Sequence, residues 1–296
     1  MRALFRHLFV PVLLAAALTS LVFREELDVR LQLLGVRLDG ASCVLLTLIW
    51  VVWLAEQLVP ARADWNAKLF SKGPGLGRDL LYLFVVTQFS ALFITLLMNP
   101  LKGALQGIGF GFDAPHLWPT GAPFVAKVAL AFFLVELASY WLHRAAHRVP
   151  LLWQFHSTHH VITQVTGLKA LHTHPVENAV FAVVRHLPLL LLGAGVSEVV
   201  AATTLGGMLG ILAHANVDVA PGPLGVVVNY PSYHAVHHSS VRDESRSNYG
   251  CHTVLFDRVF GTFRAGVSHP LTVGVEPVGP RSLWRELFWP FYRRVG

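Results

Sequence analysis

Three short motifs hold half of the chain's 16 histidines, at spacings that suit a metal site. They read HRAAH at residues 143–147, HSTHH at 156–160 and HAVHH at 234–238. Residues three and four apart share one face of a helix, so the histidines of each motif are expected to point at one ion. Imidazole is the commonest metal ligand in proteins, and eight imidazoles can fill most of two coordination spheres. We therefore predict a site for two metal ions with these ligands: His143, His147, His156, His159, His160, His234, His237 and His238.

Two further histidines are predicted to reach the metals. His174 precedes Pro175, which favours an extended backbone, and we prefer it over the neighbouring His172. His214 ends an apolar run, where a polar side chain needs a partner. His252 is expected to support the ligands rather than to bind metal itself.

Two carboxylates are predicted to orient these ligands. Metal-bound imidazoles usually donate their other N–H group to a carboxylate or a carbonyl. Glu136 lies seven residues before His143, on the same helix face two turns earlier, and Glu177 lies three residues after His174. A plain helix-end charge is the alternative interpretation of each carboxylate.

The residues alone favour no single metal. The chain contains no Glu-x-x-His motif, which is the pattern of the ferritin-like di-iron proteins. A ligand set made almost wholly of imidazole suits zinc, copper, iron or nickel. All four metals therefore stay open at this point.

The composition predicts that membrane helices carry these motifs. The chain of 296 residues is 54% hydrophobic and 14% charged, with a mean hydropathy of +0.53, whereas a soluble domain has about 25% charged residues. A spanning helix needs about 20 mostly apolar residues. The predicted fold class is therefore all-α: a multi-span helical membrane bundle with a histidine-rich cap. The candidate spans are 8–23, 43–59, 80–98 and 122–142, followed by a helical hairpin at 176–192 and 196–213.

Some of these spans are unusual. The first could be a cleavable signal peptide, but the charged residues 24–26 make a poor cleavage neighbourhood, so we expect it to be retained. Arg185 lies inside the hairpin, and a charge in a span is costly, so the hairpin is expected to enter the membrane only in part. Gly206 and Gly210 have a spacing that permits close helix packing.

We divide the chain into three regions. N-terminal helices and loops occupy 1–121, a catalytic region occupies 122–270, and a tail that suits a membrane surface occupies 271–296. The net charge of +6 is compatible with anionic lipid or an acidic partner. Nucleic-acid binding is not expected, since no nucleic-acid-binding module is visible.

The ordered set of motifs resembles the fatty acid hydroxylase/sterol desaturase superfamily of membrane di-iron enzymes. The resemblance covers roughly residues 130–265, nearly half of the chain. The matching segments are ExxxYWxHRxxH from Glu136 to His147, HSTHH, HTHPxE from His172, HAN at 214–216, PSYHAVHHS at 231–239, NYG at 248–250 and LFDRVFGTF at 255–263. Asn216 and Asn248 stand in two of these segments, and we expect them to support the site. The resemblance implies that the eight motif histidines bind two iron ions, with His174 and His214 as further ligands.

The resemblance also implies a function: oxygen-dependent hydroxylation or desaturation of a lipid such as a fatty acyl chain or a sterol-like lipid. Zinc could replace the iron in a purified sample. Electrons are expected from a separate donor resembling ferredoxin or cytochrome b5, because the chain has no His-Pro-Gly-Gly heme segment. We expect a bacterial inner membrane location, with the metal site facing the cytoplasm.

Two other functional classes fit parts of the pattern. A membrane zinc hydrolase would use metal-bound water, but it needs fewer ligands, and the HExxH motif is absent. A metal transporter or sensor should hold its ligands near the middle of the membrane, whereas these histidines flank the predicted spans.

Overall fold

The computed structural model describes residues 2–35, 39–65, 76–93, 95–96, 99–110, 117–267, 271–275 and 283–292. Across these ranges the chain forms helices and no strand, with only isolated bridges such as Val228–Thr253. The α-helices are α1 (Arg2–Val22), α2 (Arg24–Leu33), α3 (Gly40–Leu58), α4 (Leu76–Phe93), α5 (Asn99–Gly107), α6 (Phe124–Ala146), α7 (Pro150–His160), α8 (Pro175–Leu192), α9 (Val196–His214), α10 (Pro231–His237), α11 (Arg242–Ser245), α12 (Leu255–Val259) and α13 (Leu283–Tyr292). The predicted all-α fold class is confirmed.

Five of the described helices are long and apolar enough to cross a membrane: α1, α3, α6, α8 and α9. They have 18 to 23 residues, which matches the length that a bilayer core requires. Apart from one or two terminal residues, they contain the predicted spans except 80–98. Only the first part of that segment lies in α4, and residues 94 and 97–98 lie outside the described residues. The protein is thus a multi-span helical membrane protein.

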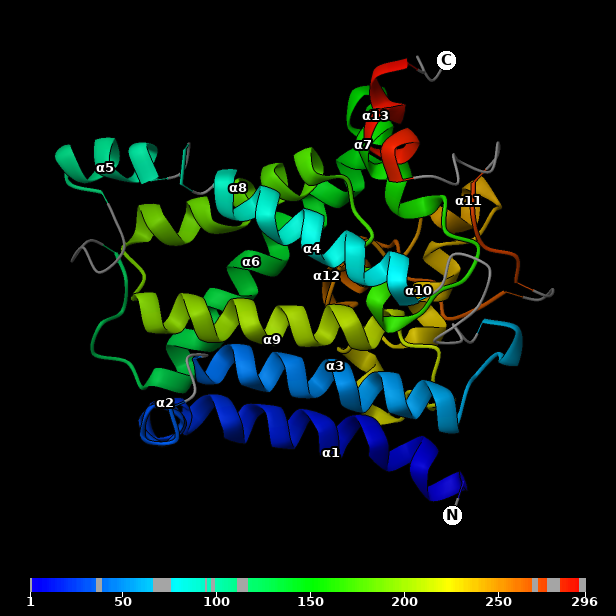
Figure 1. Cartoon of the computed structure of the whole chain (residues 1–296), viewed down its shortest axis with the longest axis horizontal. Coiled ribbons are helices and arrows are strands. Elements are labelled where there is room, and N and C mark those ends of the chain that lie inside the picture. Colours follow the sequence, from blue (N-terminus) through cyan, green and yellow to red (C-terminus); the bar gives the residue numbers. More distant parts are fainter. Residues whose placement is uncertain are drawn as a thin grey trace.

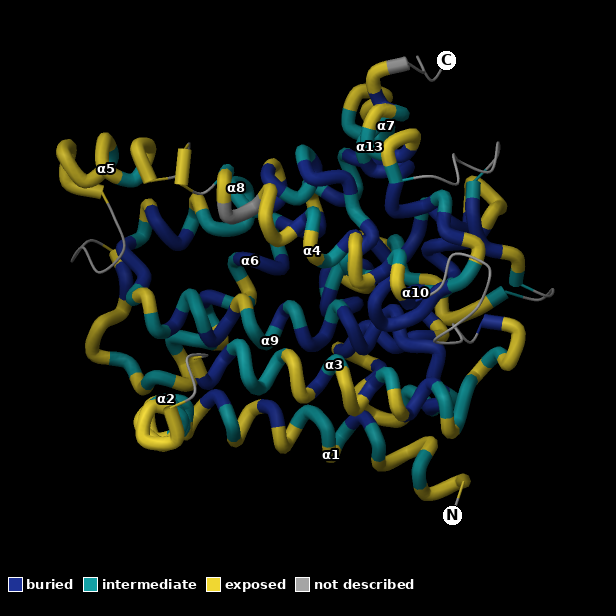
Figure 2. Tube along the Cα trace, viewed as in Figure 1, coloured by how far each residue is buried: buried dark blue, intermediate teal, exposed yellow. Residues whose placement is uncertain are grey.

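Helix α9 lies at the centre of the bundle. It contacts α6 on one side and α3 on the other, and α1 packs against both α3 and α9 (Figure 1). Helix α8 packs on α6, and α4 packs on α8. Of the five long helices, α9 is the most buried and α1 the least, because α1 lies at the margin of the bundle and exposes apolar side chains (Figure 2).

A tight turn reverses the chain between α8 and α9. Gly193 ends α8 in the left-handed conformation, with φ of 77°, which glycine adopts without steric cost. Ala194 is fully buried, and Gly195 begins α9 in extended conformation. The two helices therefore form the predicted hairpin, and each is long enough to cross the membrane.

The histidine motifs meet at one end of this bundle. The motifs lie at the end of α6, at the end of α7 and along α10, and His214 ends α9. This end is the right-hand side of Figure 1, where Figure 2 shows the densest collection of buried residues.

Helix α13 lies in the region predicted to be a surface tail, and it packs on α7. Its Glu286 is buried: one carboxylate oxygen accepts a hydrogen bond of 2.6 Å from the Tyr82 hydroxyl, and the other pairs with Arg78. Trp284 on the same helix is 69% exposed. The tail thus attaches to the bundle by a polar anchor while an aromatic side chain stays on the surface.

Candidate metal centre

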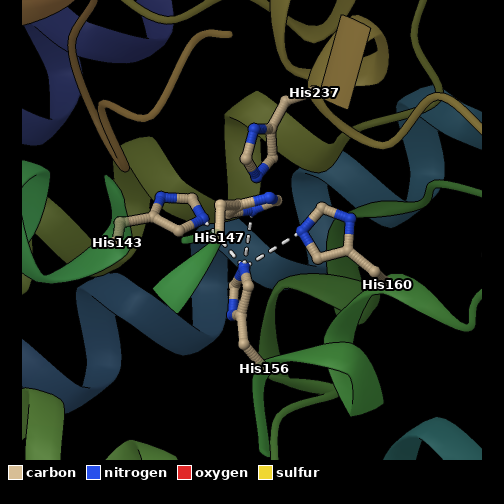
Figure 3. Close-up of side chains that lie close together, drawn as sticks. All are labelled: His143, His147, His156, His160 and His237. Carbon is tan, nitrogen blue, oxygen red and sulfur yellow. Dashed lines mark hydrogen bonds between the residues drawn. The ribbon is translucent and has the colours of Figure 1, made fainter. Parts of the chain in front are cut away.

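The structure gathers nine of the ten predicted ligands into two groups. In each group the candidate ligand atoms lie within 4.8 Å of one another, and every residue is buried. Figure 3 shows the five rings of the first group converging on a common point. Group one contains His143, His147, His156, His160 and His237, and group two contains His159, His214, His234 and His238.

Each HxxHH motif is divided between the two groups. On α7, His156 and His160 belong to group one, while His159 belongs to group two. On α10 the order is reversed, so that His237 alone joins group one. His143 and His147 lie in one group as expected, but for the two HxxHH motifs the expectation that each motif faces a single ion is not what the structure shows. With 3.6 residues per turn, positions three and four after the first histidine lie on opposite sides of its direction, about 100° apart.

The nitrogens of group one face one another. The Nε2 atom of His156 lies 3.0 Å from the Nε2 atom of each of three other rings, those of His143, His147 and His160. One N–H group cannot serve three acceptors at once. The Nε2 atom of His237 is buried and has no hydrogen-bond partner, a state that proteins avoid. A cation between these nitrogens would accept all of their lone pairs, so the residues fit a metal ion.

Group two has the same character. The Nε2 atom of His214 lies 3.1 Å from that of His159, 2.9 Å from that of His234 and 3.3 Å from that of His238. The Nε2 atoms of His234 and His238 are 3.2 Å apart. Four buried imidazoles with converging nitrogens again suit a cation with nitrogen ligands.

Backbone oxygens hold several of the rings in this orientation. A ring whose Nδ1–H donates to an oxygen presents the lone pair of Nε2 to a metal. The acceptors are the carbonyl oxygens of Tyr249 for His143 (2.6 Å), Ser247 for His237 (2.7 Å), Gly210 for His214 (2.8 Å) and His172 for His159 (3.2 Å).

Burial lowers the pKa of several imidazoles outside the spans. It lowers the pKa of His237 to about 3, and it holds the pKa of His160 and of His234 well below the ordinary value, with neighbouring imidazoles adding to the effect. The same holds for His147 and His238. Since only the neutral ring offers a lone pair, these side chains are ready to bind metal at neutral pH.

The two predicted carboxylates have different partners. Glu177 Oε1 lies 2.5 Å from Nδ1 of His156 and so supports a ring of group one. Glu136 contacts His252 instead, with Oε2 at 2.5 Å from Nδ1. Its Oε1 accepts from the backbone N–H groups of His252 (3.1 Å) and Thr253 (2.9 Å). Glu136 thereby holds the segment that packs beneath the histidines.

The two predicted asparagines organise loops. The Asn216 side chain donates to the Arg62 carbonyl (2.7 Å) and accepts from the Arg62 N–H group (2.9 Å). The Asn248 side chain donates to the carbonyls of Tyr233 and Arg264, and it has a positive φ of 52°. Neither contacts a ligand ring by a hydrogen bond, so both act on the chain around the site.

His174 belongs to neither group. Its Nδ1 atom accepts a hydrogen bond from the Val176 N–H group as the N-cap of α8, and its Nε2–H donates to the carbonyl of Leu287 on α13 at 2.9 Å. His172 is also outside both groups, with its ring stacked on Tyr82 at 3.8 Å between centroids. The His172 carbonyl nevertheless supports His159, so this segment reaches the site through its backbone.

The two glycines of α9 make room for a ring rather than for another helix. A Cβ atom on Gly206 would lie 3.2 Å from Cε1 of His252, and one on Gly210 would lie 3.6 Å from its Cδ2. The predicted supporting role of His252 thus has a structural counterpart, because its ring lies between α9 and Glu136.

A cavity of about 170 Å³ opens beside both groups. His143 and His156 line it from group one, and His214 lines it from group two. Apolar side chains form much of the remaining wall, including Phe181 and Ile211. A substrate in this cavity would face both candidate metal positions. At about 30 Å³ for each water molecule, the volume corresponds to roughly six of them, so it suits one end of a lipid.

Comparison with known proteins shows that the segment with the histidine motifs matches a known protein family. Residues 128–262 match the model of the fatty acid hydroxylase family, and this range includes both histidine groups. The chain thus contains a region that matches the fatty acid hydroxylase family, and the resemblance inferred from the motifs is confirmed. No solved structure matches the chain.

Three relatives show the breadth of the superfamily. The ornithine lipid hydroxylase OlsE of Rhizobium tropici is 27% identical over 285 residues, which cover 96% of this chain and 83% of OlsE. The alkylglycerol monooxygenase of Homo sapiens is 30% identical over 191 residues, which cover 60% of this chain and 40% of that protein. The very-long-chain aldehyde decarbonylase GL1-6 of Oryza sativa subsp. indica is 30% identical over 142 residues, which cover 43% of this chain and 21% of that protein. The chain spans less than half of the latter two proteins.

Proposed function

We propose that this protein is a membrane lipid hydroxylase that uses two iron ions, O₂ and electrons from a separate donor. The observation that carries the proposal is the pair of buried histidine groups opening on one cavity with apolar walls. The names of two relatives, a lipid hydroxylase and a monooxygenase, support oxidation of a lipid.

The described residues suit this chemistry. Group one and group two would each hold one ion, and iron would supply the capacity to insert an oxygen atom from O₂ into a C–H bond. Glu177 and the backbone oxygens orient the rings, which reduces the reorganisation needed on metal binding. Burial lowers the pKa of several of these rings, which keeps those rings neutral. His174 is left out of the proposed ligand set, because both of its ring nitrogens have other partners.

The membrane supplies the substrate in this proposal. The cavity lies between α6, α8 and α9, which are long enough to span the bilayer, so a lipid can reach it from the hydrocarbon region. We place the histidine end on the cytoplasmic side of a bacterial inner membrane, where a ferredoxin-like or cytochrome b5-like donor could deliver electrons. The net charge of +6 favours an acidic donor, since opposite charge accelerates encounter.

Metal analysis with lipid analysis tests the proposal. The protein is expressed with iron, purified in detergent and compared with a His156→Ala/His214→Ala variant and with His186→Ala as a control. His186 lies on α8 and bonds to Ala182 and Thr203, away from both groups. We expect about two irons per chain, one for each histidine group, and an O₂-dependent lipid product that the double variant does not form. One tightly held zinc with no iron would instead favour the hydrolase alternative.

A further inference from the structure

Arg185 is a charged residue in the middle of a membrane helix. It lies on α8, eight residues after Glu177, which is about 12 Å along a helix. Charged residues inside spans are costly and usually mark a functional site. The side chain lines the cavity beside the histidine groups.

The guanidinium of Arg185 has only weak or neutral partners. Its Nε–H donates to the Ser139 hydroxyl at 2.9 Å, its Nη2 lies 3.9 Å from the Cys251 sulfur, and its carbon lies 4.9 Å from the centroid of the Phe181 ring. Within the described part of the chain no carboxylate forms an ion pair with it. Nη1 has no hydrogen-bond partner among the described residues and is not fully buried, and the Arg185 side chain lines the cavity.

Two lysines with little exposure in the described chain are paired with carboxylates. Lys169 pairs with Asp79, and Lys127 pairs with Glu198 at 2.5 Å. Burying a charge is costly unless it is paired and hydrogen-bonded. Arg185 therefore lacks the partner that these lysines have, and the cavity is the space from which a partner could come.

Two carboxylates lie near the cavity. The Oε1 atom of Glu177 contacts the His156 ring, while its Oε2 atom is buried without a hydrogen-bond partner. Both oxygens of Glu136 are taken by His252 and Thr253. Neither is paired with Arg185. The chain thus presents an unneutralised cation to whatever fills the cavity.

The guanidinium is also close to the metal ligands. The Cys251 sulfur lies 3.9 Å from Nη2 of Arg185 and 3.8 Å from Nδ1 of His143. One sulfur atom therefore separates the cation from a ring of group one. If the anionic group of a substrate bound to Arg185, the carbon atom that faces the histidines would be only a few bonds away from that group.

We propose that Arg185 binds the anionic group of the substrate, so that the protein acts on an anionic lipid near its charged end. This inference rests on the proposed function, and it deepens it by naming the substrate class. Nη1 and Nη2 can donate to one carboxylate or phosphate, the arrangement in which arginine binds such groups most strongly. Ser139 fixes the plane of the guanidinium through Nε. A neutral ether or alcohol would leave the cation unpaired and is disfavoured.

Lipid binding to the detergent-purified, iron-loaded protein tests this inference. Radiolabelled oleate is the probe, and unlabelled oleate, oleoyl lysophosphatidate and oleyl alcohol compete with it. We expect at least one anionic lipid to compete about tenfold better than the alcohol. Preference for oleate would identify a carboxylate as the anion, and preference for lysophosphatidate a phosphate. Equal competition by oleyl alcohol and both anionic lipids would overturn the proposal.

Matched variants separate binding from structural support. Arg185→Gln should weaken binding of the preferred anionic lipid by roughly tenfold to a hundredfold and leave oleyl alcohol binding nearly unchanged, while Arg185→Lys should keep part of the preference. Arg24→Gln is the control, since Arg24 also donates to a serine, Ser197, but does not line the cavity. An equal loss for charged and neutral lipids in Arg185→Gln would indicate a structural role and contradict the proposal.

Two readouts keep this inference distinct from the proposed function. Iron content and O₂-dependent product formation test the function, whereas the anion preference tests Arg185. If Arg185→Gln does not fold, Arg185→Lys and the preference of the unchanged protein still decide the question. A protein that holds iron and oxidises lipid but shows no anion preference would retain its proposed function and lose the role given to Arg185.

Discussion

His159 and His160 are neighbours in the chain, yet they belong to different metal groups. Their ring centroids are 5.6 Å apart and their planes are nearly perpendicular, at 88°. The Nε2 atom of His159 lies 3.1 Å from that of His214, whereas the Nε2 atom of His160 lies 3.0 Å from that of His156. Helix α7 therefore contributes to both groups at once.

Helix α10 mirrors this arrangement. His234 and His238 face group two, and His237 faces group one. Because α7 and α10 each contribute to both groups, the spacing between the two candidate ions depends on both short helices. A shift of either helix would disturb both positions together.

Replacement of these neighbouring histidines should affect the two ions differently. His159→Ala removes one of four group-two rings, and His160→Ala removes one of five group-one rings. We expect iron to fall from about two per chain toward about one in His159→Ala, and by less in His160→Ala, with product formation lost in at least the former. Metal analysis beside His186→Ala checks this. Equal loss of iron in all three variants would contradict the division into groups.

Glu177 should control metal retention through His156. Its carboxylate lies 2.5 Å from His156 Nδ1, and loss of such a partner usually lowers metal affinity about tenfold to a hundredfold. We expect Glu177→Ala to release iron to a chelator faster than Glu177→Gln, because the amide oxygen can still accept the imidazole proton. Chelator competition measures this order. Identical release from both variants and the unchanged protein would remove Glu177 from the site.

Glu136 should matter chiefly for stability. Glu136→Ala would leave the ring of His252 and the N–H groups of His252 and Thr253 without their acceptor. Each buried unsatisfied group costs about 1–3 kcal/mol, so the variant should unfold at a clearly lower temperature in detergent. Glu25→Ala, at an exposed position on α2, is the control. An unchanged melting temperature would mean that these bonds contribute little.

Acid should destabilise the metal-free protein. Burial lowers the pKa of His237 to about 3 and holds that of His160 well below its ordinary value, whereas histidine in an unfolded chain has a pKa of about 6.5. Below that pH the unfolded chain binds more protons, so stability present above about 6.5 is lost progressively as pH falls toward 3. Thermal unfolding of chelator-treated protein at about pH 8 and about pH 5 checks this. A higher melting temperature at the lower pH would contradict the sign.

The membrane helices and the metal-binding motifs could be predicted without the structure. Apolar runs of about 20 residues indicate spans because lipid provides no partner for the backbone and so demands helix. The confirmed helices α1, α3, α6, α8 and α9 follow from this rule. The clustered imidazoles predicted a metal site because few other roles require so many neutral nitrogen donors. These features depend on residue type and local spacing alone.

Long-range contacts decided the rest. Which ion a ring faces depends on where α7, α9 and α10 meet, and the motif spacing cannot supply that position. His174 resembles a ligand in the sequence, but α13 and the start of α8 take both of its nitrogens. In the sequence, Arg185 only interrupts an apolar run. In the structure, it contacts Ser139 and Cys251 beside the cavity. The physical reason is that a side chain's chemistry depends on partners from distant segments, which only the folded chain brings together.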